Sequence, residues 1–143
     1  MKEINHEYYV SPEVAKLLKQ AGFDWECRMI HFCYVEDDNM WNLEDNHKQA
    51  RRILKLDYCL LAPTLEVAQR WLREVKHKSI EVKSFVDGTV ENIGKWWIWH
   101  VYNFNPPIDW VFLRRSGCRY STYEEAQEAG IKKALEIILK KEE

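Results

Sequence analysis

The sequence has no long hydrophobic run and little glycine or proline. Its 143 residues include only 5 glycines, 4 prolines and 4 cysteines, and they contain no internal repeat, low-complexity tract or interdomain linker. No apolar stretch approaches the roughly 20 residues that a membrane-spanning helix needs, and the polar first residues lack the apolar region of a signal peptide. We therefore expect a cytoplasmic protein with no membrane partner, whose cysteines stay reduced.

An excess of charge of one sign is also missing. The formal net charge is −2, whereas proteins that bind duplex nucleic acid usually carry a basic excess, because phosphate neutralisation supplies much of their affinity. This balance disfavours nucleic acid as a partner, although the net charge does not exclude a local basic patch. Enzyme motifs are absent as well: there is no Gly-x-Ser-x-Gly elbow, phosphate loop, dinucleotide fingerprint or His-Glu-x-x-His pair. We therefore expect no cofactor and favour a non-enzymatic protein.

Aromatic residues are the abundant component. The chain has 7 Trp, 7 Tyr and 5 Phe, within a composition that is 46% hydrophobic and 31% charged, as is typical of a globular protein. Aromatic side chains supply large buried area and most of the energetic hot spots of interfaces. The length fits a single domain over residues 1–143, large enough for apolar packing alone to hold its core.

Three segments carry the apolar spacing of helices, and each has its own start signal. The first follows Ser11 and stops at Gly22, the second runs over residues 64–76, and the third begins with a capping box at Thr122. Gly130 lies inside the third helix, where glycine is less favourable than alanine by up to ~1 kcal/mol. We therefore expect another element to pack closely against Gly130.

Alternating or apolar runs predict strands over residues 25–35, 58–61, 79–86, 95–104 and 109–114. The third and fourth of these form a hairpin with a turn signal at Asp87-Gly88. Residues 36–46 are polar and predict a loop, and residues 49–56 fit either a short helix or a strand. The order predicts an α+β fold, with a mixed, mostly antiparallel sheet of four to five strands and about three helices packed on one face.

Three helical stretches together resemble a known family. They contain the runs VSPEVAKLL, APTLEVAQRWLRE and YSTYEEA, at residues 10–18, 62–74 and 120–126. As a set they resemble a family of short proteins of unknown function carried by Bacteroidales genomes and their phages. The resemblance implies a gut-bacterial or phage source, and it carries no catalytic or binding role over to any residue.

The most distinctive segment is the tryptophan-rich run over residues 96–102. On a strand, alternation gives one face with Trp96, Ile98, His100 and Tyr102 and another with Trp97, Trp99 and Val101. One face must meet the helices. The other is buried by a second layer, covered by a partner protein or by a second copy in a symmetric homodimer, or left as a stacking platform. The candidate binding residues are Trp96, Trp97, Trp99, His100 and Tyr102.

Three other clusters of reactive or charged residues have simpler interpretations. Cys27, His31 and Cys33 share a strand face, but a strand separates the two thiols by about 20 Å, so one zinc ion cannot bind both and we expect no metal. The acidic residues of 36–45 lack the glycine and ligand spacing of an EF-hand. A candidate basic patch, which is either a solvated helix face or a contact for phosphate or an acidic partner, comprises Lys48, Arg51, Arg52 and Lys55.

The aromatic richness and the missing catalytic motifs favour a non-enzymatic interaction protein that binds another protein. The alternative is a small-molecule or single-stranded nucleic-acid binder that uses the Trp-rich strand for stacking. Neither interpretation identifies the partner.

Overall fold

Two three-stranded antiparallel sheets, rather than the one larger sheet that we expected, make up the β-structure. The computed structural model describes residues 8–33, 41–45, 59–89, 92–105 and 109–140. One sheet has the order β2-β1-β3, with strands β1 (Met29–Phe32), β2 (Asn42–Asp45) and β3 (Cys59–Leu61). The other has the order β4-β5-β6, with strands β4 (Lys78–Thr89), β5 (Asn92–Asn105) and β6 (Asp109–Arg115).

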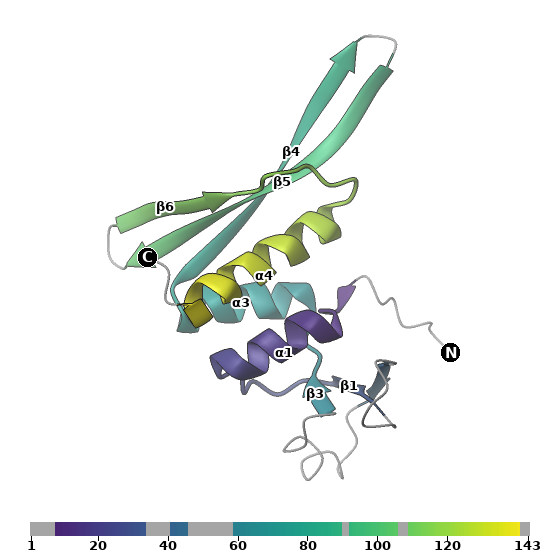
Figure 1. Ribbon diagram of the computed structural model, residues 1–143, viewed down its shortest axis with the longest axis vertical. Helices are drawn as coiled ribbons and strands as arrows, with labels where there is room; N and C mark the ends of the chain where they lie inside the picture. Colours follow the sequence, from purple (N-terminus) through teal and green to yellow (C-terminus); the bar gives the residue numbers. More distant parts are fainter. Residues whose placement is uncertain (1–7, 34–40, 46–58, 90–91, 106–108, 141–143) are drawn as a thin grey trace.

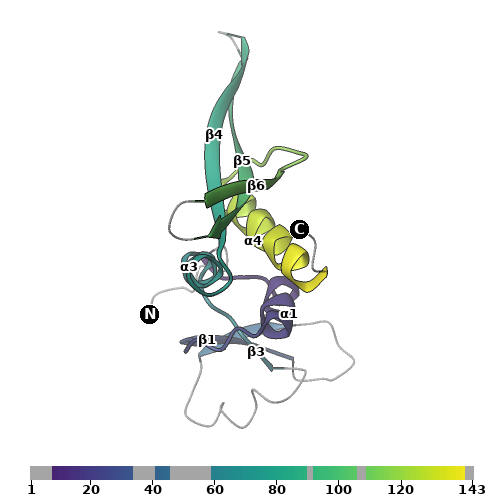
Figure 2. The same cartoon turned by 90° about the vertical axis from the view of Figure 1, so that its left-hand side faces the viewer.

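The helices lie between the two sheets (Figures 1 and 2), which explains why the strands do not form a single sheet. They are α1 (Pro12–Ala21), α3 (Leu65–Val75) and α4 (Tyr123–Lys140). Both α3 and α4 contact the β4-β5-β6 sheet, while α1 contacts α4 on one side and β3 on the other. The α+β class is thus confirmed. None of the described helices combines the length and apolar character needed to cross a membrane.

All three predicted helices begin where their capping signals place them. The side-chain oxygens of Ser11, Thr64 and Thr122 each accept the N–H of the third following residue, at 3.3, 3.2 and 3.2 Å. Gly22 ends α1 with a φ of 96°, in the left-handed region that favours glycine at this position. These signals are local in the sequence, so tertiary contacts do not have to be known to predict them.

Two predictions for the first half of the chain need correction. Of residues 25–33, the described part of the strand expected over 25–35, only β1 is a strand, because its backbone finds partners on both sides in β2 and β3. The expected loop over 36–46 contains a strand, β2, which pairs with β1 from Phe32↔Asn42 to Met29↔Asp45. Edge strands tolerate charged side chains, so the polar composition of β2 did not predict its pairing. Residues 36–40 and 46 of that loop and residues 49–56 lie outside the described residues.

The hairpin of β4 and β5 is confirmed, but its turn is not at Asp87-Gly88. Gly88 has a φ of 123°, a value that a turn glycine can adopt. The strand nevertheless continues through it, with Asp87 paired to Gly94 and Thr89 paired to Asn92. The reversal therefore comes after Thr89, and the two strands form a ribbon that extends beyond the helical layer (Figure 1).

An apolar core joins the helices to the inner face of the β4-β5-β6 sheet. Trp71, Leu72 and Ile131 are at most 1% exposed and belong to one continuous cluster with Ile80 and Trp99. The close packing expected at Gly130 is present. A Cβ atom at this position would lie 2.8 Å from Cγ2 of Ile80 and 3.1 Å from Cβ of Trp99.

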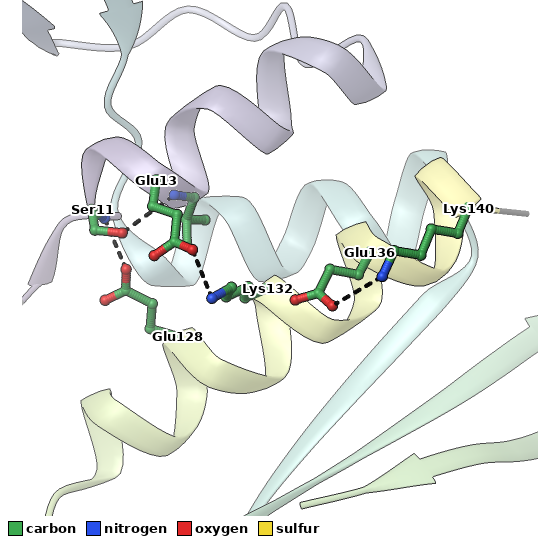
Figure 3. Close-up of polar contacts among 7 residues, drawn as sticks. Ser11, Glu13, Glu128, Lys132, Glu136 and Lys140 are labelled. Carbon is green, nitrogen blue, oxygen red and sulfur yellow. Dashed lines mark hydrogen bonds and ion pairs between the residues drawn. The ribbon is translucent and has the colours of Figure 1, made fainter. Parts of the chain in front are cut away.

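Two polar contacts fix the start of α1 on α4 (Figure 3). Glu128 of α4 accepts a hydrogen bond of 2.9 Å from the backbone N–H of Ser11, which has no partner inside the helix. One turn further along α4, Lys132 forms an ion pair of 2.7 Å with Glu13. Both side chains of that ion pair are largely exposed, at 39% and 67%. We therefore expect the Glu128 contact to stabilise the docking more than the ion pair does.

Replacing Glu128 with alanine is expected to lower the free energy of unfolding by about 1–2 kcal/mol, because a backbone N–H loses a charged acceptor. Lys132→Ala is the matched control and is expected to change it by less than about 1 kcal/mol, as for exposed ion pairs. Urea denaturation of both variants measures the difference. Equal losses in the two variants would contradict this interpretation of the α1–α4 contact.

Candidate binding surface

Alternation along β5 divides the predicted binding residues between two environments. Trp99 and Val101 are 7% and 0% exposed, and Trp99 packs on α4 at Gly130. Trp97, on the same face, meets the ring of Tyr123 at 5.3 Å between centroids, edge to face. These inward residues join the sheet to α4. They hold the surface in place but are not exposed on it.

The opposite side of this sheet is partly exposed, and no described element packs over it (Figures 1 and 2). We call it the outer face and define it by Glu81, Lys83, Phe85, Trp96, Ile98, His100, Tyr102 and Phe112. The strand register supports this set, because Glu81, Lys83 and Phe85 are paired with His100, Ile98 and Trp96, and Phe112 is paired with Tyr102. Three of the five predicted binding residues, Trp96, His100 and Tyr102, therefore lie on one partly exposed face.

Three rings form a cluster on the outer face, where β5 pairs with β6. The centroid of His100 lies 6.2 Å from that of Tyr102 and 5.8 Å from that of Phe112, and Tyr102 and Phe112 are 5.7 Å apart. All three pairs are edge-to-face, which is a favourable geometry for aromatic rings. Phe112 is 52% exposed. Nδ1 of His100 is shielded from solvent and has no hydrogen-bond partner among the described residues.

Basic side chains also lie at the outer face. The guanidinium of Arg119 lies 4.2 Å from the ring centroid of Trp96, and Arg115 is paired across the strands with His100. Lys83 is on the same face but is already paired with Glu81 at 3.4 Å. Residues 92–121 of the sequence contain four basic residues and one acidic residue. Lys95 and Arg114 belong to the opposite face, with Trp97 and Val101, so the basic side chains of this stretch at the outer face are Arg115 and Arg119.

Sequence reasoning missed Phe85, Phe112 and Arg119 as members of this surface. Phe85 was part of a predicted strand, but its position next to Trp96 depends on the hairpin register. Phe112 reaches Tyr102 only because the pairing of β5 with β6 shifts between Val101 and Tyr102. Such a shift has no signal in this sequence, so the composition of the outer face could not be predicted.

The other predicted clusters do not form a second site. His31 is 6% exposed, and its Nε2 lies 2.5 Å from the carbonyl oxygen of Val10. The thiol of Cys27 donates to the carbonyl of Trp25 at 3.4 Å. Among the described residues, no group of three or more His, Cys, Asp or Glu side chains has the arrangement of a metal site. The candidate basic patch, Lys48, Arg51, Arg52 and Lys55, lies outside the described residues.

A small pocket of about 200 Å³ lies between α1 and β3. Its lining consists of Ala15, Leu18, Lys19, Phe23, Cys59 and Leu61. Burial raises the pKa of the Cys59 thiol, which keeps it in the unreactive protonated form at neutral pH. These lining residues place no general base beside the thiol, so they do not make a nucleophilic site.

Only one cysteine is expected to react with a thiol reagent in the folded protein. Cys118 is exposed, whereas Cys33 and Cys59 are buried. Burial also raises the pKa of Cys27 to about 12, so its thiolate is scarce at pH values near 8. Titration with a chromogenic disulfide should therefore modify Cys118 quickly and the other three only after denaturant is added. Rapid modification of a second thiol without denaturant would contradict the packing around these cysteines.

Comparison with known proteins assigns neither a family nor a function to the chain. No protein-family model matches the chain, and no curated protein or solved structure matches it.

Proposed function

We propose that this chain is a non-enzymatic interaction protein, of phage or mobile-element origin, that binds another protein through the outer face. The observation that carries the proposal is the cluster of His100, Tyr102 and Phe112, which is partly exposed on the outer face of the sheet. Large rings held in one geometry lose little conformational entropy on binding. They are also among the residue types that carry most of the energy of protein interfaces.

The surroundings of the rings suit an interface as well. A typical binding surface has an apolar, often aromatic centre and a polar rim, with arginine enriched relative to lysine. Here Arg115 is paired with His100, Arg119 lies over Trp96 on the same face, and the Glu81–Lys83 ion pair lies at the β4 side. The sheet is backed by the helical layer through Trp99 and Gly130, so the outer face is preorganised.

The test uses Phe112→Ser beside a matched control, Tyr8→Ser. Phe112 and Tyr8 are 52% and 53% exposed, so both variants remove an equally accessible ring. Tyr8 is next to Tyr9, which forms a β-bridge with Thr64 at the start of α3. Tyr8 is therefore far along the chain from the strands of the outer face. Proteins captured from the native host by the wild-type chain are purified and titrated against both variants by calorimetry. We expect Phe112→Ser to weaken binding at least about tenfold, the effect of losing a hot-spot ring. Equal affinities of the wild type and Phe112→Ser would exclude the outer face.

A second candidate, single-stranded nucleic acid, is favoured by one specific observation. Arg119 lies over Trp96, on the same face as the ring cluster, and sheets that bind single strands combine exposed rings with basic side chains. Fluorescence anisotropy with short mixed oligonucleotides tests this candidate at low and physiological salt. Tight, salt-sensitive binding that is lost in both Arg119→Ser and Tyr102→Ser would replace the protein partner as the preferred ligand. Binding unaffected by both substitutions would place any nucleic-acid contact elsewhere.

A further inference from the structure

The outer edge of β4 carries backbone groups that the sheet does not use. Backbone groups of alternate residues point to opposite sides of a strand. On β5, Trp97 exchanges two hydrogen bonds of 2.8 Å with Tyr120, on the side away from β4. The backbone N–H and C=O groups of even-numbered β5 residues, such as Ile98, therefore point toward β4. Ile98 pairs there with Lys83. It follows that the N–H and C=O groups of Val82, Ser84 and Val86 point away from β5.

This open edge has a definite limit at each end. The carbonyl of Ile80 also points outward, but it accepts a hydrogen bond of 2.7 Å from Nε2 of Gln69 on α3. At the other end, Gly88 departs from extended geometry, with a φ of 123°. Between them, no described strand pairs with β4 on this side. The open edge thus spans residues 82–86, and its midpoint is Ser84.

We propose that the open edge pairs antiparallel with the open edge of a second copy of this chain, with Ser84 at the two-fold axis. The two β4-β5-β6 sheets then form one continuous sheet. In this register Val82 lies opposite Val86 of the second copy, and the pairing adds about six backbone hydrogen bonds. The capped carbonyl of Ile80 falls beside Gly88 of the second copy, so the two features that end the open edge coincide.

The side chains along the edge support a second copy as the occupant. Val86 is 64% exposed, more than any other large hydrophobic residue that the structure describes. The register covers it with Val82 of the second copy. On the outer face, Lys83 lies opposite Phe85 of the second copy, so the one lysine of the open edge faces a ring rather than a second lysine. The next pair on that face, Glu81 and Asp87 of the second copy, is acidic on both sides and lies beyond the open edge. Exposed strand edges with alternating apolar residues are ready templates for such pairing.

The proposed dimer has a consequence for the outer face. A two-fold axis between antiparallel strands is perpendicular to the sheet, so both outer faces lie on the same side of the joined sheet. Two aromatic clusters would then be presented together, which raises the apparent affinity for a partner with two copies of its own site. The pairing itself does not depend on what the outer face binds.

Sedimentation equilibrium of the full chain tests the proposal with Ser84→Pro and its matched control Ser84→Ala. Proline removes an N–H that points away from β5, so the β4–β5 hydrogen bonds remain. We expect a concentration-dependent dimer for the wild type and Ser84→Ala, and a monomer for Ser84→Pro with an unchanged circular dichroism spectrum. Val86→Lys is a second variant at an exposed position, where folding is not at risk, and it is expected to be monomeric too.

Disulfide trapping tests the register. In a Cys118→Ser background, Ser84→Cys is expected to cross-link to itself, since directly opposite residues lie about 5.5 Å apart. Val82→Cys, which is off the axis, is expected not to do so. A wild-type chain that stays monomeric at its highest soluble concentration overturns the proposal. A dimer that survives both Ser84→Pro and Val86→Lys also overturns the proposal. If Phe112→Ser dissociated such a dimer, its interface would be the outer face instead of the open edge.

Discussion

Replacing Trp99 with alanine is expected to lower the free energy of unfolding by about 3–5 kcal/mol, the range for removing a large buried aromatic side chain. Trp99 is 7% exposed, and its Cβ and Cγ atoms lie against α4 at Gly130. The truncation leaves a cavity at the point where the sheet and the helical layer meet. Urea denaturation followed by far-ultraviolet circular dichroism measures the loss.

Tyr102→Ala is the control for this prediction, because it removes a ring from the same strand on the opposite face. Tyr102 is only partly buried and contacts His100 and Phe112 rather than the helices. Its loss should cost about 1 kcal/mol, the contribution of one or two edge-to-face ring pairs. If Tyr102→Ala destabilised the fold as much as Trp99→Ala, the outer face would be part of the core rather than a binding surface.

Gly130→Val is expected to lower the free energy of unfolding by about 3 kcal/mol or more. Alanine at an average helix position would gain up to ~1 kcal/mol over glycine. At position 130, however, a Cβ would lie 2.8 Å from Cγ2 of Ile80, and the β-branched valine adds two methyl groups to that contact. Overpacking of this kind typically costs about 1–3 kcal/mol for each small insertion.

Gly117→Ala is the matched control for the glycine prediction. A Cβ at position 117 would have nothing within 4 Å, so its free energy of unfolding should stay within about 0.5 kcal/mol of the wild type. Thermal and urea denaturation of both glycine variants measure the contrast. An unchanged stability of Gly130→Val would mean that α4 does not pack on Ile80 and Trp99 as described.

Local signals in the sequence account for most of what could be predicted. The starts of the helices depend on side chains within a few residues of the backbone groups they cap, as at Ser11 and Thr64. Gly130, which is unfavourable inside a helix, correctly predicted that another element packs closely against α4 at this position. Alternation also predicted that Trp97 and Trp99 lie on the opposite face of the strand from Trp96, and the strand register confirms this.

Pairing between distant strands could not be predicted in the same way. Nothing local tells β1 to pair with β2 and β3 rather than with the later strands, so the number of sheets was wrong. The missing information is the position of the helical layer, which both sheets contact. The shift between β5 and β6 also depends on tertiary structure, and it brings Phe112 to Tyr102 and completes the ring cluster.

Hydroxyl-radical footprinting of the chain, free and bound to its captured partner, tests the central claim most directly. It reports the solvent access of each aromatic side chain, so it separates the outer face from every other surface. We expect Tyr102 and Phe112 to become protected in the complex, while Tyr8, which is as exposed as Phe112 in the free chain, keeps its reactivity. Unchanged reactivity of Tyr102 and Phe112, with protection elsewhere, would contradict the assignment of the outer face as the binding surface.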